Sequence, residues 1–339
     1  MNHSPVIECV PNFSEGRRPE VINQIAAAVR SVQGATVLHI DQGYAANRTV
    51  ITFAGQPDAI CEAAFQAAKA AAELIDMRHH HGEHPRIGAT DVLPLVPVSG
   101  ISLDACALLA RQLAFRMADE LGIPCYLYEA AALKPAHRNL ADCRKGEYEA
   151  IARKLADPGL APDVMPHPSF LMPQPTYLRT GCSVVGARDF LLAVNFNLNT
   201  RSSDEATAIA RKVRQSGYKG QPGTLRAAKA IGWYIEEYGC AQVSMNLCNL
   251  HETSLHTAYL EVSRQAEARG VKVTGTEIIG LVPMETILAA GRYFCGETEA
   301  DEDLLISTAI RQLGLDSLRP FLPEEKILEK VLQKTKQNE

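Results

Sequence analysis

The spacing of apolar and polar residues predicts alternating strands and helices in the first half of the chain. PEVINQIAAAVRSV (19–32) and the alanine-rich 57–77 carry apolar residues at helical spacing, and each begins with a proline. Between them, ATVLHID and RTVITFAG predict two strands, separated by the turn-rich QGYAAN. With VIECVPN in front and DVLPLVPV (91–98) behind, the order is β-α-β-β-α-β, the split β-α-β arrangement.

Two further features of this half bear on the expected sheet. Pro94 cannot donate a backbone hydrogen bond, so we expect the strand over 91–98 to lie at an edge or to be interrupted. A helix over 102–121 and the strand CYLYEAA then extend the arrangement.

The second half is a looser copy of the same alternation. FLLAVNFNLNT predicts a strand, as do AQVSMNLCNL and VKVTGTEIIGLVP. Helical spacing predicts helices over 203–216, 224–237 and 254–269, followed by two closing helices.

A proline-rich stretch separates the two halves. DPGLAPDVMPHPSFLMPQPTYLRTG (157–181) holds six prolines, too many for a helix or a central strand. The stretch is either a boundary linker or a long ordered loop that lines a site. We therefore predict two α/β subdomains, 1–180 and 181–330, followed by a tail at 331–339.

Composition and charge argue against several classes of function. The hydrophobic fraction of 46% and the charged fraction of 22% are ordinary for a globular protein. The net charge of −5 argues against nucleic acid as a partner, and no stretch approaches the roughly 18 apolar residues of a membrane span. The N-terminus does not resemble a signal peptide, and nine cysteines without a C-x-x-C pair indicate reduced thiols. We expect a cytoplasmic protein with no nucleic-acid or membrane partner.

The stretch HHHGEHPRIGATD (79–91) holds four of the ten histidines. His80, Glu83 and His84 match H-x-x-E-H, a zinc peptidase motif that needs both histidines on one face of a helix. A glycine and a proline inside the stretch argue against a helix. A zinc-dependent hydrolase is therefore the weaker alternative, and a metal assay on the purified protein would decide it.

The four histidines have different surroundings. His79, His80 and His81 fit a solvated end of the preceding helix, where cationic side chains complement the helix dipole. His84 is followed by Pro85, which restricts the backbone conformation of the residue before it. Imidazole titrates near neutrality, so His84 suits proton transfer. From spacing alone, a proton-transfer site and a polar loop remain equally open.

Ten motifs, in order along the chain, resemble one known family. They are ECVPNFSEG, NRTV, GQP, LIDMR, GEHPRIGATDVLP, YLYE, GEYEA, GQPG, AIGWY and QLGLDSLRPF. The family is that of the glutamate formimidoyltransferases, whose domain also forms the N-terminal part of the bifunctional formimidoyltransferase-cyclodeaminase. The resemblance runs from about residue 6 to about residue 330, so no appended cyclodeaminase domain is expected.

The resemblance implies a fold and a reaction. The fold is α/β (α+β), with two ferredoxin-like split β-α-β subdomains and a folate cleft between them, and the protein is a homodimer. The reaction transfers a formimidoyl group from N-formimidoyl-L-glutamate to N5 of the co-substrate tetrahydrofolate, in histidine degradation. The family's catalytic histidine lies in the G-E-H-P motif, which is His84 here.

Two other functions stay open beside this one. A related one-carbon transfer, such as formyl transfer from 5-formyltetrahydrofolate to glutamate, would use the same motifs. A folate-binding or scaffolding protein without activity is the alternative from a non-catalytic class.

The implied reaction needs two proton transfers and no metal. Attack of N5 on the amidine carbon forms a tetrahedral intermediate, from which the glutamate nitrogen must leave. One histidine can accept the proton of N5 and return it to the leaving nitrogen. Asp41, at the end of a predicted strand, is either a group that orients His84 or a turn-forming aspartate.

Both implied substrates carry carboxylates, which suit the guanidinium fork of arginine. Arg48, Arg86 and Arg188 are the substrate-binding candidates, with surface ion pairs as the ordinary alternative. Arg48 and Arg86 lie in the strongest matching motifs.

The family's folate-binding stretch corresponds here to roughly 165–181. In this chain the stretch is longer and richer in proline than in the animal enzymes, so its individual contacts stay open. Asn195 and Asn197 alternate on one face of a predicted strand, which either meets the pterin edge or faces solvent. The folate candidates are Met165, Pro166, His167, Pro168, Ser169, Phe170, Gly181, Asn195 and Asn197.

Overall fold

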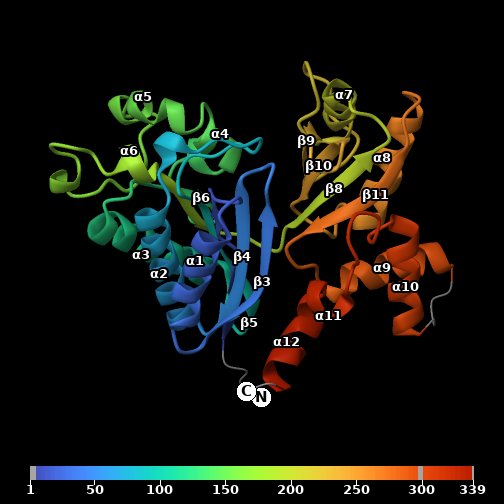
Figure 1. The fold of residues 1–339 in the computed structure, drawn as a ribbon, viewed down its shortest axis with the longest axis horizontal. Helices are drawn as coiled ribbons and strands as arrows, with labels where there is room; N and C mark the ends of the chain where they lie inside the picture. The colour runs from blue at the N-terminus through green and yellow to red at the C-terminus, as the bar shows by residue number, and fades with distance from the viewer. Residues whose placement is uncertain (1–4, 297–300, 338–339) are drawn as a thin grey trace. The chain divides into compact units, whose positions relative to one another are not determined.

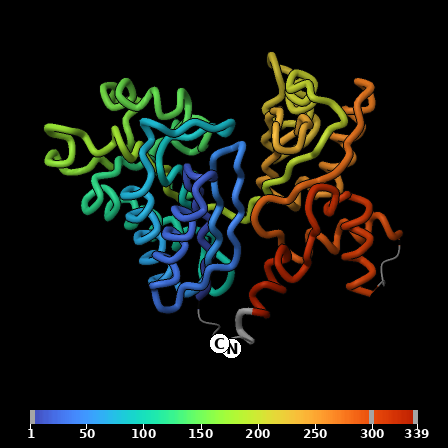
Figure 2. The backbone as a smooth tube through the Cα atoms, in the orientation of Figure 1, coloured from blue at the N-terminus to red at the C-terminus, as the bar shows by residue number. Residues whose placement is uncertain are grey.

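The computed structural model describes residues 5–296 and 301–337 of the chain (Figures 1 and 2). The chain divides into two compact units, and the division falls between Asp189 and Phe190. It lies after the expected boundary near 180 because strand β7 (Ser183–Ala187) pairs with two strands of the first unit.

The first unit is built on a seven-stranded sheet. Strand β3 pairs with β4, β4 with β1 and β2, and both of these with β5, all antiparallel. Strands β7 and β6 continue from β5 in parallel. The run β1-α1-β3-β4-α2-β5 is the predicted split β-α-β arrangement. The elements are β1 (Val6–Cys9), β2 (Asn12–Phe13), α1 (Pro19–Arg30), β3 (Ala35–Gly43), β4 (Arg48–Gly55), α2 (Pro57–Leu74), β5 (Thr90–Ser99), α3 (Leu103–Leu121) and β6 (Cys125–Glu129).

Strand β5 lies inside the sheet, so the expectation that Pro94 holds it to an edge is wrong. On one side β5 pairs with β1 and β2, and on the other side with β7. Pro94 faces the break between β1 and β2, where its carbonyl oxygen accepts the N–H of Val10. The N–H that proline lacks therefore falls at a point where the ladder is already interrupted.

Apolar residues cover both faces of the sheet near β6. Leu127 packs in the large core that α1, α2 and α3 share with the strands, and Figure 1 shows these helices grouped beside the sheet. Tyr126 and Tyr128 point to the other face, where they pack with Cys143 and Ile151. This alternation is the period of two that a strand imposes on its side chains.

Between β6 and β7 the chain forms short helices joined by loops. The proline-rich stretch 157–181 belongs here and is an ordered loop of the first unit (Figure 2). Val164 exchanges two backbone hydrogen bonds with Cys125, and Asp163 Oδ2 accepts the N–H of Leu127 at 2.8 Å. The elements are η2 (Pro135–His137), α4 (Leu140–Arg144), η3 (Tyr148–Ala150), α5 (Ile151–Ala156), η4 (Pro168–Phe170) and α6 (Tyr177–Thr180).

The second unit has a four-stranded antiparallel sheet in the order β11-β8-β10-β9. Its run β8-α7-β9-β10-α8-β11 repeats the split β-α-β arrangement, so both units have the predicted ferredoxin-like topology. The elements are β8 (Leu192–Leu198), α7 (Ser203–Val213), β9 (Ala228–Ile235), β10 (Cys240–Leu247), α8 (Leu255–Glu267), β11 (Val273–Ile279), α9 (Met284–Cys295), α10 (Glu302–Leu313), α11 (Pro323–Lys326) and α12 (Leu328–Gln337).

Strand β9 corrects the helix expected over 224–237. Residues 228–235 pair in register with β10, and Gly232 lies against α7. A Cβ at Gly232 would come 2.0 Å from the backbone nitrogen of Thr207, so only glycine allows this approach. Tertiary pairing therefore overrides the helical tendency of the alanine-rich stretch.

The C-terminal residues are also more regular than expected. Residues 331–337 of the expected tail belong to α12, and 338–339 lie outside the described residues. Within the described ranges, no helix is both long and apolar enough to cross a membrane.

Candidate active site

The loop that carries the histidines is not helical. After η1 (Met77–His79), residues 80–84 form no helix, and β5 begins at Thr90. Gly82 passes close to the preceding hairpin, because a Cβ there would come 2.2 Å from the carbonyl oxygen of Ala46. The zinc peptidase motif therefore lacks the helix that it requires. Within 5–296 and 301–337, no group of three or more His, Cys, Asp and Glu is placed to hold a metal ion.

His80 is buried, which contradicts the solvated helix end predicted for it. The residue is 7% exposed, and its Nε2 lies 2.8 Å from the carbonyl oxygen of Asn47. Burial lowers the pKa of His80. Asn47 also accepts the N–H of Gly16 and donates to the carbonyl oxygen of His81. His80 is thus a structural link from the loop to the start of β4, while His79 and His81 are exposed.

His84 is half-buried, and its ring is held by its own loop. Nδ1 lies 2.8 Å from the carbonyl oxygen of Pro85. A carbonyl only accepts, so Nδ1 carries the proton and Nε2 carries the lone pair of the neutral ring. Burial, and then the charges of Arg48 and Arg144, lower the pKa of His84 well below its usual value. The imidazole is therefore neutral at physiological pH and able to accept a proton.

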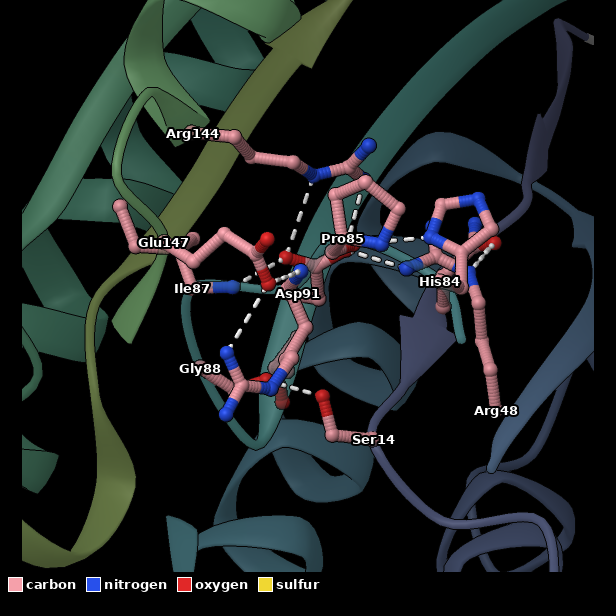
Figure 3. A network of polar contacts seen from close by, with 12 residues as sticks. Ser14, Arg48, His84, Pro85, Ile87, Gly88, Asp91, Arg144 and Glu147 are labelled. Atoms are coloured by element: carbon pink, nitrogen blue, oxygen red, sulfur yellow. Dashed lines mark hydrogen bonds and ion pairs between the residues drawn. The ribbon is translucent and has the colours of Figure 1, made fainter. Parts of the chain in front are cut away.

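Beside His84, two arginines share one buried aspartate (Figure 3). Asp91, at the start of β5, has no exposed surface, and its Oδ2 lies 2.5 Å from Arg48 Nη1 and 2.6 Å from Arg144 Nη2. Arg144 Nε donates to Oδ1 at 3.2 Å, so Arg144 grips the carboxylate with two nitrogens. Arg48 Nε donates to Asn12 Oδ1 at 2.9 Å.

Asp91 also joins this ion cluster to the histidine loop. Its Oδ1 accepts the N–H of Ile87 at 2.8 Å, which fixes the backbone shortly after His84. Burial alone would raise the pKa of Asp91, but Arg144 and Arg48 outweigh it and lower the pKa to about 2. Asp91 is therefore an anion at any physiological pH.

Arg86 is occupied by acidic residues of a neighbouring segment. Its Nη1 donates to Glu147 at 2.9 Å and to Glu149 at 2.8 Å, and its Nη2 donates to Glu149 at 2.6 Å. Nη2 also reaches the carbonyl oxygen of His80 at 3.2 Å. The Arg86 side chain is 8% exposed. These contacts tie the histidine loop to residues 147–149.

The other two candidates in the first unit lie in different surroundings. Asp41 is on β3, and its Oδ2 lies 3.6 Å from Nε2 of His39. The charges of Arg48, Arg144 and Asp91 act on the pKa of His84. Arg188 follows β7, is half-buried and donates to the carbonyl oxygen of Asp189 at 2.9 Å.

The folate candidates of the proline-rich loop divide into exposed and packed residues. Met165, His167, Pro168 and Ser169 are exposed, and Pro166 is buried. His167 caps η4 by accepting the N–H of Ser169. The loop therefore presents a short exposed stretch on a buried anchor.

Phe170 and Gly181 hold this loop to the rest of the unit. The Phe170 ring lies against Gly122, whose Cβ would come 2.6 Å from Cδ1 of that ring. Gly181 has a φ of +68°, and a Cβ there would come 2.2 Å from the carbonyl oxygen of Ile87. Gly181 thus packs the end of the loop directly against the chain that follows His84.

Asn195 and Asn197 belong to a polar network on the second unit's sheet. Asn195 Nδ2 donates to Glu277 Oε2 at 3.0 Å, and Gln242 Nε2 donates to Asn197 Oδ1 at 2.7 Å. Tyr238 donates its hydroxyl to Glu277 Oε1 at 2.8 Å. Both asparagines are buried, so the interpretation of this face as simply solvent-exposed does not hold for them.

The sequence analysis did not identify Asp91, Arg144, Glu147 and Glu149. Asp91 and the two glutamates stand inside motifs that carry the resemblance, namely GEHPRIGATDVLP and GEYEA. A buried strand that begins with an acid also signals that a cation must lie nearby. Arg144 carries no such signal, because only the fold brings α4 to the start of β5.

Comparisons with known proteins match almost the whole chain. A family model described as the N-terminal subdomain of the formiminotransferase domain matches residues 6–188, and one described as the formiminotransferase domain matches residues 193–333. The chain is 41% identical to a glutamate formimidoyltransferase of Streptococcus pyogenes serotype M1, over 85% of this chain and 93% of that protein. It is 38% identical to a glutamate formimidoyltransferase of Thermoplasma acidophilum, over 88% and 94%.

A longer relative matches as well. The chain is 44% identical to the formimidoyltransferase-cyclodeaminase of Rattus norvegicus, over 96% of this chain and 60% of that protein. The chain thus spans about 60% of the length of this relative. With two family models that together cover most of its length, the chain belongs to the formiminotransferase family.

Proposed function

We propose that the chain is a glutamate formimidoyltransferase. It transfers the formimidoyl group of N-formimidoyl-L-glutamate to N5 of tetrahydrofolate in histidine degradation, with His84 as the general acid and base. The observation that carries this proposal is the state of His84, a half-buried neutral imidazole held by Pro85 beside two arginines. The names of the relatives support the same reaction.

The proposed mechanism uses His84 Nε2 twice. As N5 of tetrahydrofolate attacks the amidine carbon, Nε2 accepts the proton that N5 loses. The tetrahedral intermediate then expels the glutamate nitrogen, which takes the proton back from Nε2. Because Arg48 and Arg144 disfavour the imidazolium, the protonated ring returns its proton readily. Holding both substrates in one site removes much of the entropic barrier.

The arginines have different proposed roles. Arg48 binds a substrate carboxylate, because it stands beside His84 and shares its acidic partner Asp91 with Arg144. For Arg86, the bonds to Glu147 and Glu149 favour a role in fixing the histidine loop over substrate binding. Arg188 stays a candidate because the guanidinium fork suits carboxylates, and Asp41 stays a candidate as a group that orients His84.

For folate binding we propose the loop 165–181 and the polar face that carries Asn195 and Asn197. The support is the resemblance, the exposed stretch at the tip of the loop, and the hydrogen-bonding groups on the sheet. We also propose that the protein is a cytoplasmic homodimer. All nine cysteines are free thiols, which fits a reducing compartment.

A coupled assay tests the proposed reaction. Purified protein is incubated with tetrahydrofolate and N-formimidoyl-L-glutamate, N-formyl-L-glutamate or N-formimidoylglycine, and in a parallel reaction with 5-formyltetrahydrofolate and L-glutamate. The products are identified by mass spectrometry. We expect 5-formimidoyltetrahydrofolate from the first donor at the highest kcat/KM. Formyl transfer from 5-formyltetrahydrofolate to glutamate as the faster reaction would instead favour the related activity, and no turnover with any pair would reject both.

A further inference from the structure

The ion cluster beside His84 carries more positive than negative charge. Arg48 and Arg144 both pair with Asp91, so two cations share one anion and the cluster has a net charge of +1. The side chains are almost completely buried, with 10% of Arg48, 11% of Arg144 and 0% of Asp91 exposed. A buried unpaired charge is costly, so such a cluster favours binding of an anion.

Two acidic residues close to the histidine loop pair with a different arginine. Glu147 and Glu149 pair with Arg86, and both are largely exposed, at 41% and 61% of their side chains. The other partner of Arg48 is the neutral Asn12. In the described part of the chain, the acid that contacts either arginine of the cluster is Asp91.

Each arginine keeps one terminal nitrogen for a further acceptor. Arg48 uses Nε and Nη1, and Arg144 uses Nε and Nη2, for the contacts described above. The hydrogen bonds found over residues 5–296 and 301–337 do not use Nη2 of Arg48 or Nη1 of Arg144. Asp91 thus orients two guanidinium groups, each with one terminal nitrogen that Asp91 does not bind (Figure 3).

We propose that Arg48 and Arg144, fixed by Asp91, form an anion subsite for one carboxylate group, and that Arg144 is a substrate-binding residue. The inference rests on the proposed function for the identity of the substrates, and it adds a residue outside the motifs that carry the resemblance. Both arginines act electrostatically on His84, so the subsite is adjacent to the reacting atoms. Two arginines from separate elements, β4 and α4, recognise a planar carboxylate with more geometric specificity than one cation.

The carboxylate can come from either substrate. The donor carries the carboxylates of glutamate, and tetrahydrofolate carries those of its glutamyl tail. Tetrahydropteroate, which lacks that tail, and N-formimidoylglycine, which lacks the side-chain carboxylate, separate these sources.

The test compares two variants of Arg144 with a matched control. Arg144→Gln removes the charge, and Arg144→Lys keeps the charge but not the fork. Arg116→Gln is the control, because Arg116 bridges Glu62 and Glu120 on the surface of the first unit. Circular dichroism and Tm verify the fold of each variant, and KM, kcat and the Kd for L-glutamate and tetrahydrofolate are then measured.

We expect Arg144→Gln to raise KM roughly ten- to hundredfold for the substrate whose carboxylate binds in the subsite. Arg144→Lys should have a smaller effect on the same KM. A rise confined to N-formimidoyl-L-glutamate assigns the carboxylate to the donor. A rise for tetrahydrofolate that is absent with tetrahydropteroate assigns it to the folate tail. Unchanged KM for both substrates in Arg144→Gln overturns the proposal. If that variant does not fold, Arg144→Lys decides, since wild-type KM values there overturn the proposal equally.

Failure of the proposed function is a separate result. If the wild-type protein transfers no formimidoyl group, the proposed function is wrong. Calorimetry then measures binding of L-glutamate and tetrahydrofolate, which tests the subsite independently of that function. Binding that Arg144→Gln weakens and Arg116→Gln leaves intact supports the subsite. Equal binding by wild type and Arg144→Gln, or no binding by the wild type, overturns it.

Discussion

The two units share one topology but place different polar groups on it. In the first unit, ionised side chains surround the half-buried imidazole of His84, and the Arg48–Asp91–Arg144 cluster has a net charge of +1. In the second unit, neutral donors surround the carboxylate of Glu277, which accepts hydrogen bonds from Tyr238 and Asn195. The same split β-α-β frame therefore holds a site suited to proton transfer in one unit and a hydrogen-bonding surface in the other.

The difference follows from what each task requires. A proton-transfer group needs its pKa adjusted, and nearby charges at low exposure do this more strongly than neutral dipoles. Recognition of a ligand edge needs donors and acceptors in fixed positions, which neutral amides provide at a smaller desolvation cost. Substitution of His84 should therefore change kcat and its pH dependence, and substitutions on the second unit's polar face should change KM.

His84→Ala should give the largest effect. Loss of the proposed acid and base should lower kcat by about 10²–10⁴-fold with little change in substrate affinity. His81→Ala is the matched control, because His81 lies on the same loop but is exposed, and it should retain kcat within about twofold. Steady-state kinetics measure both. A near-normal kcat in His84→Ala would show that His84 is not the general acid and base.

Asp91→Asn should be the most destabilising single change in the cluster. It leaves two buried guanidinium groups without their anion, which costs about 3–5 kcal/mol of unfolding free energy. Urea unfolding at pH 7 measures this difference. A decrease in unfolding free energy below about 1 kcal/mol would mean that water replaces the contacts that the two arginines lose.

The acid side of the stability curve gives an independent check on Asp91. Its pKa is lowered to about 2 in the folded protein, so the stabilisation is present above the ordinary pKa near 4. It is lost as the pH falls from about 4 through about 2, and amounts to about 2 kcal/mol. Asp91→Asn should lack this component of acid destabilisation.

The topology of both units could be predicted because local spacing encodes it. Residues 19–32 and 57–77 have helical spacing, and the strands between them alternate, whatever their partners are. Strand β9 could not be predicted in this way. Its alanine-rich sequence has helical propensity, and the pairing with β10 and the approach of Gly232 to α7 decide its conformation.

The sequence indicated the proposed site only where a single stretch of residues holds it. His84 stands out because Pro85 and the G-E-H-P motif adjoin it in the sequence. The His80 ring, in contrast, contacts the carbonyl oxygen of Asn47, which is distant in the sequence. The ion cluster likewise forms only because Arg144, on α4, contacts Asp91, on β5. Such long-range contacts leave no periodic signal in the sequence, so they follow from the fold alone.

The pH dependence of kcat/KM tests the electrostatic part of the comparison. The groups that act on the pKa of His84 include Arg48 on β4, Arg144 on α4, Asp91 on β5 and the carbonyl of Pro85. Because the pKa of His84 lies well below 6.5, activity should be level near neutrality and fall only at lower pH, as the base becomes protonated.

Arg144→Gln removes one of the two positive charges that lower this pKa. The pKa of His84 should rise, and the acid limb of kcat/KM should move to higher pH, whereas Arg144→Lys should leave it near the wild-type position. A limb that stays in place in Arg144→Gln would show that burial, and not charge, sets the pKa.

The smallest effect is expected on the second unit's polar face, from Asn195→Ala. This change removes one hydrogen bond to Glu277, while Tyr238 and Gln242 still donate to that carboxylate at 2.8 and 3.4 Å. Asn195 is also proposed to bond to folate, and one such bond is worth about 0.5–1.5 kcal/mol, so KM for tetrahydrofolate should rise about two- to tenfold. Asn249→Ala, which removes a hydrogen bond to Glu252 in the loop after β10 and away from this face, is the matched control. If Asn195→Ala instead lowers kcat or moves its acid limb while KM is unchanged, the second unit takes part in the proton transfer, and the contrast between the two units is wrong.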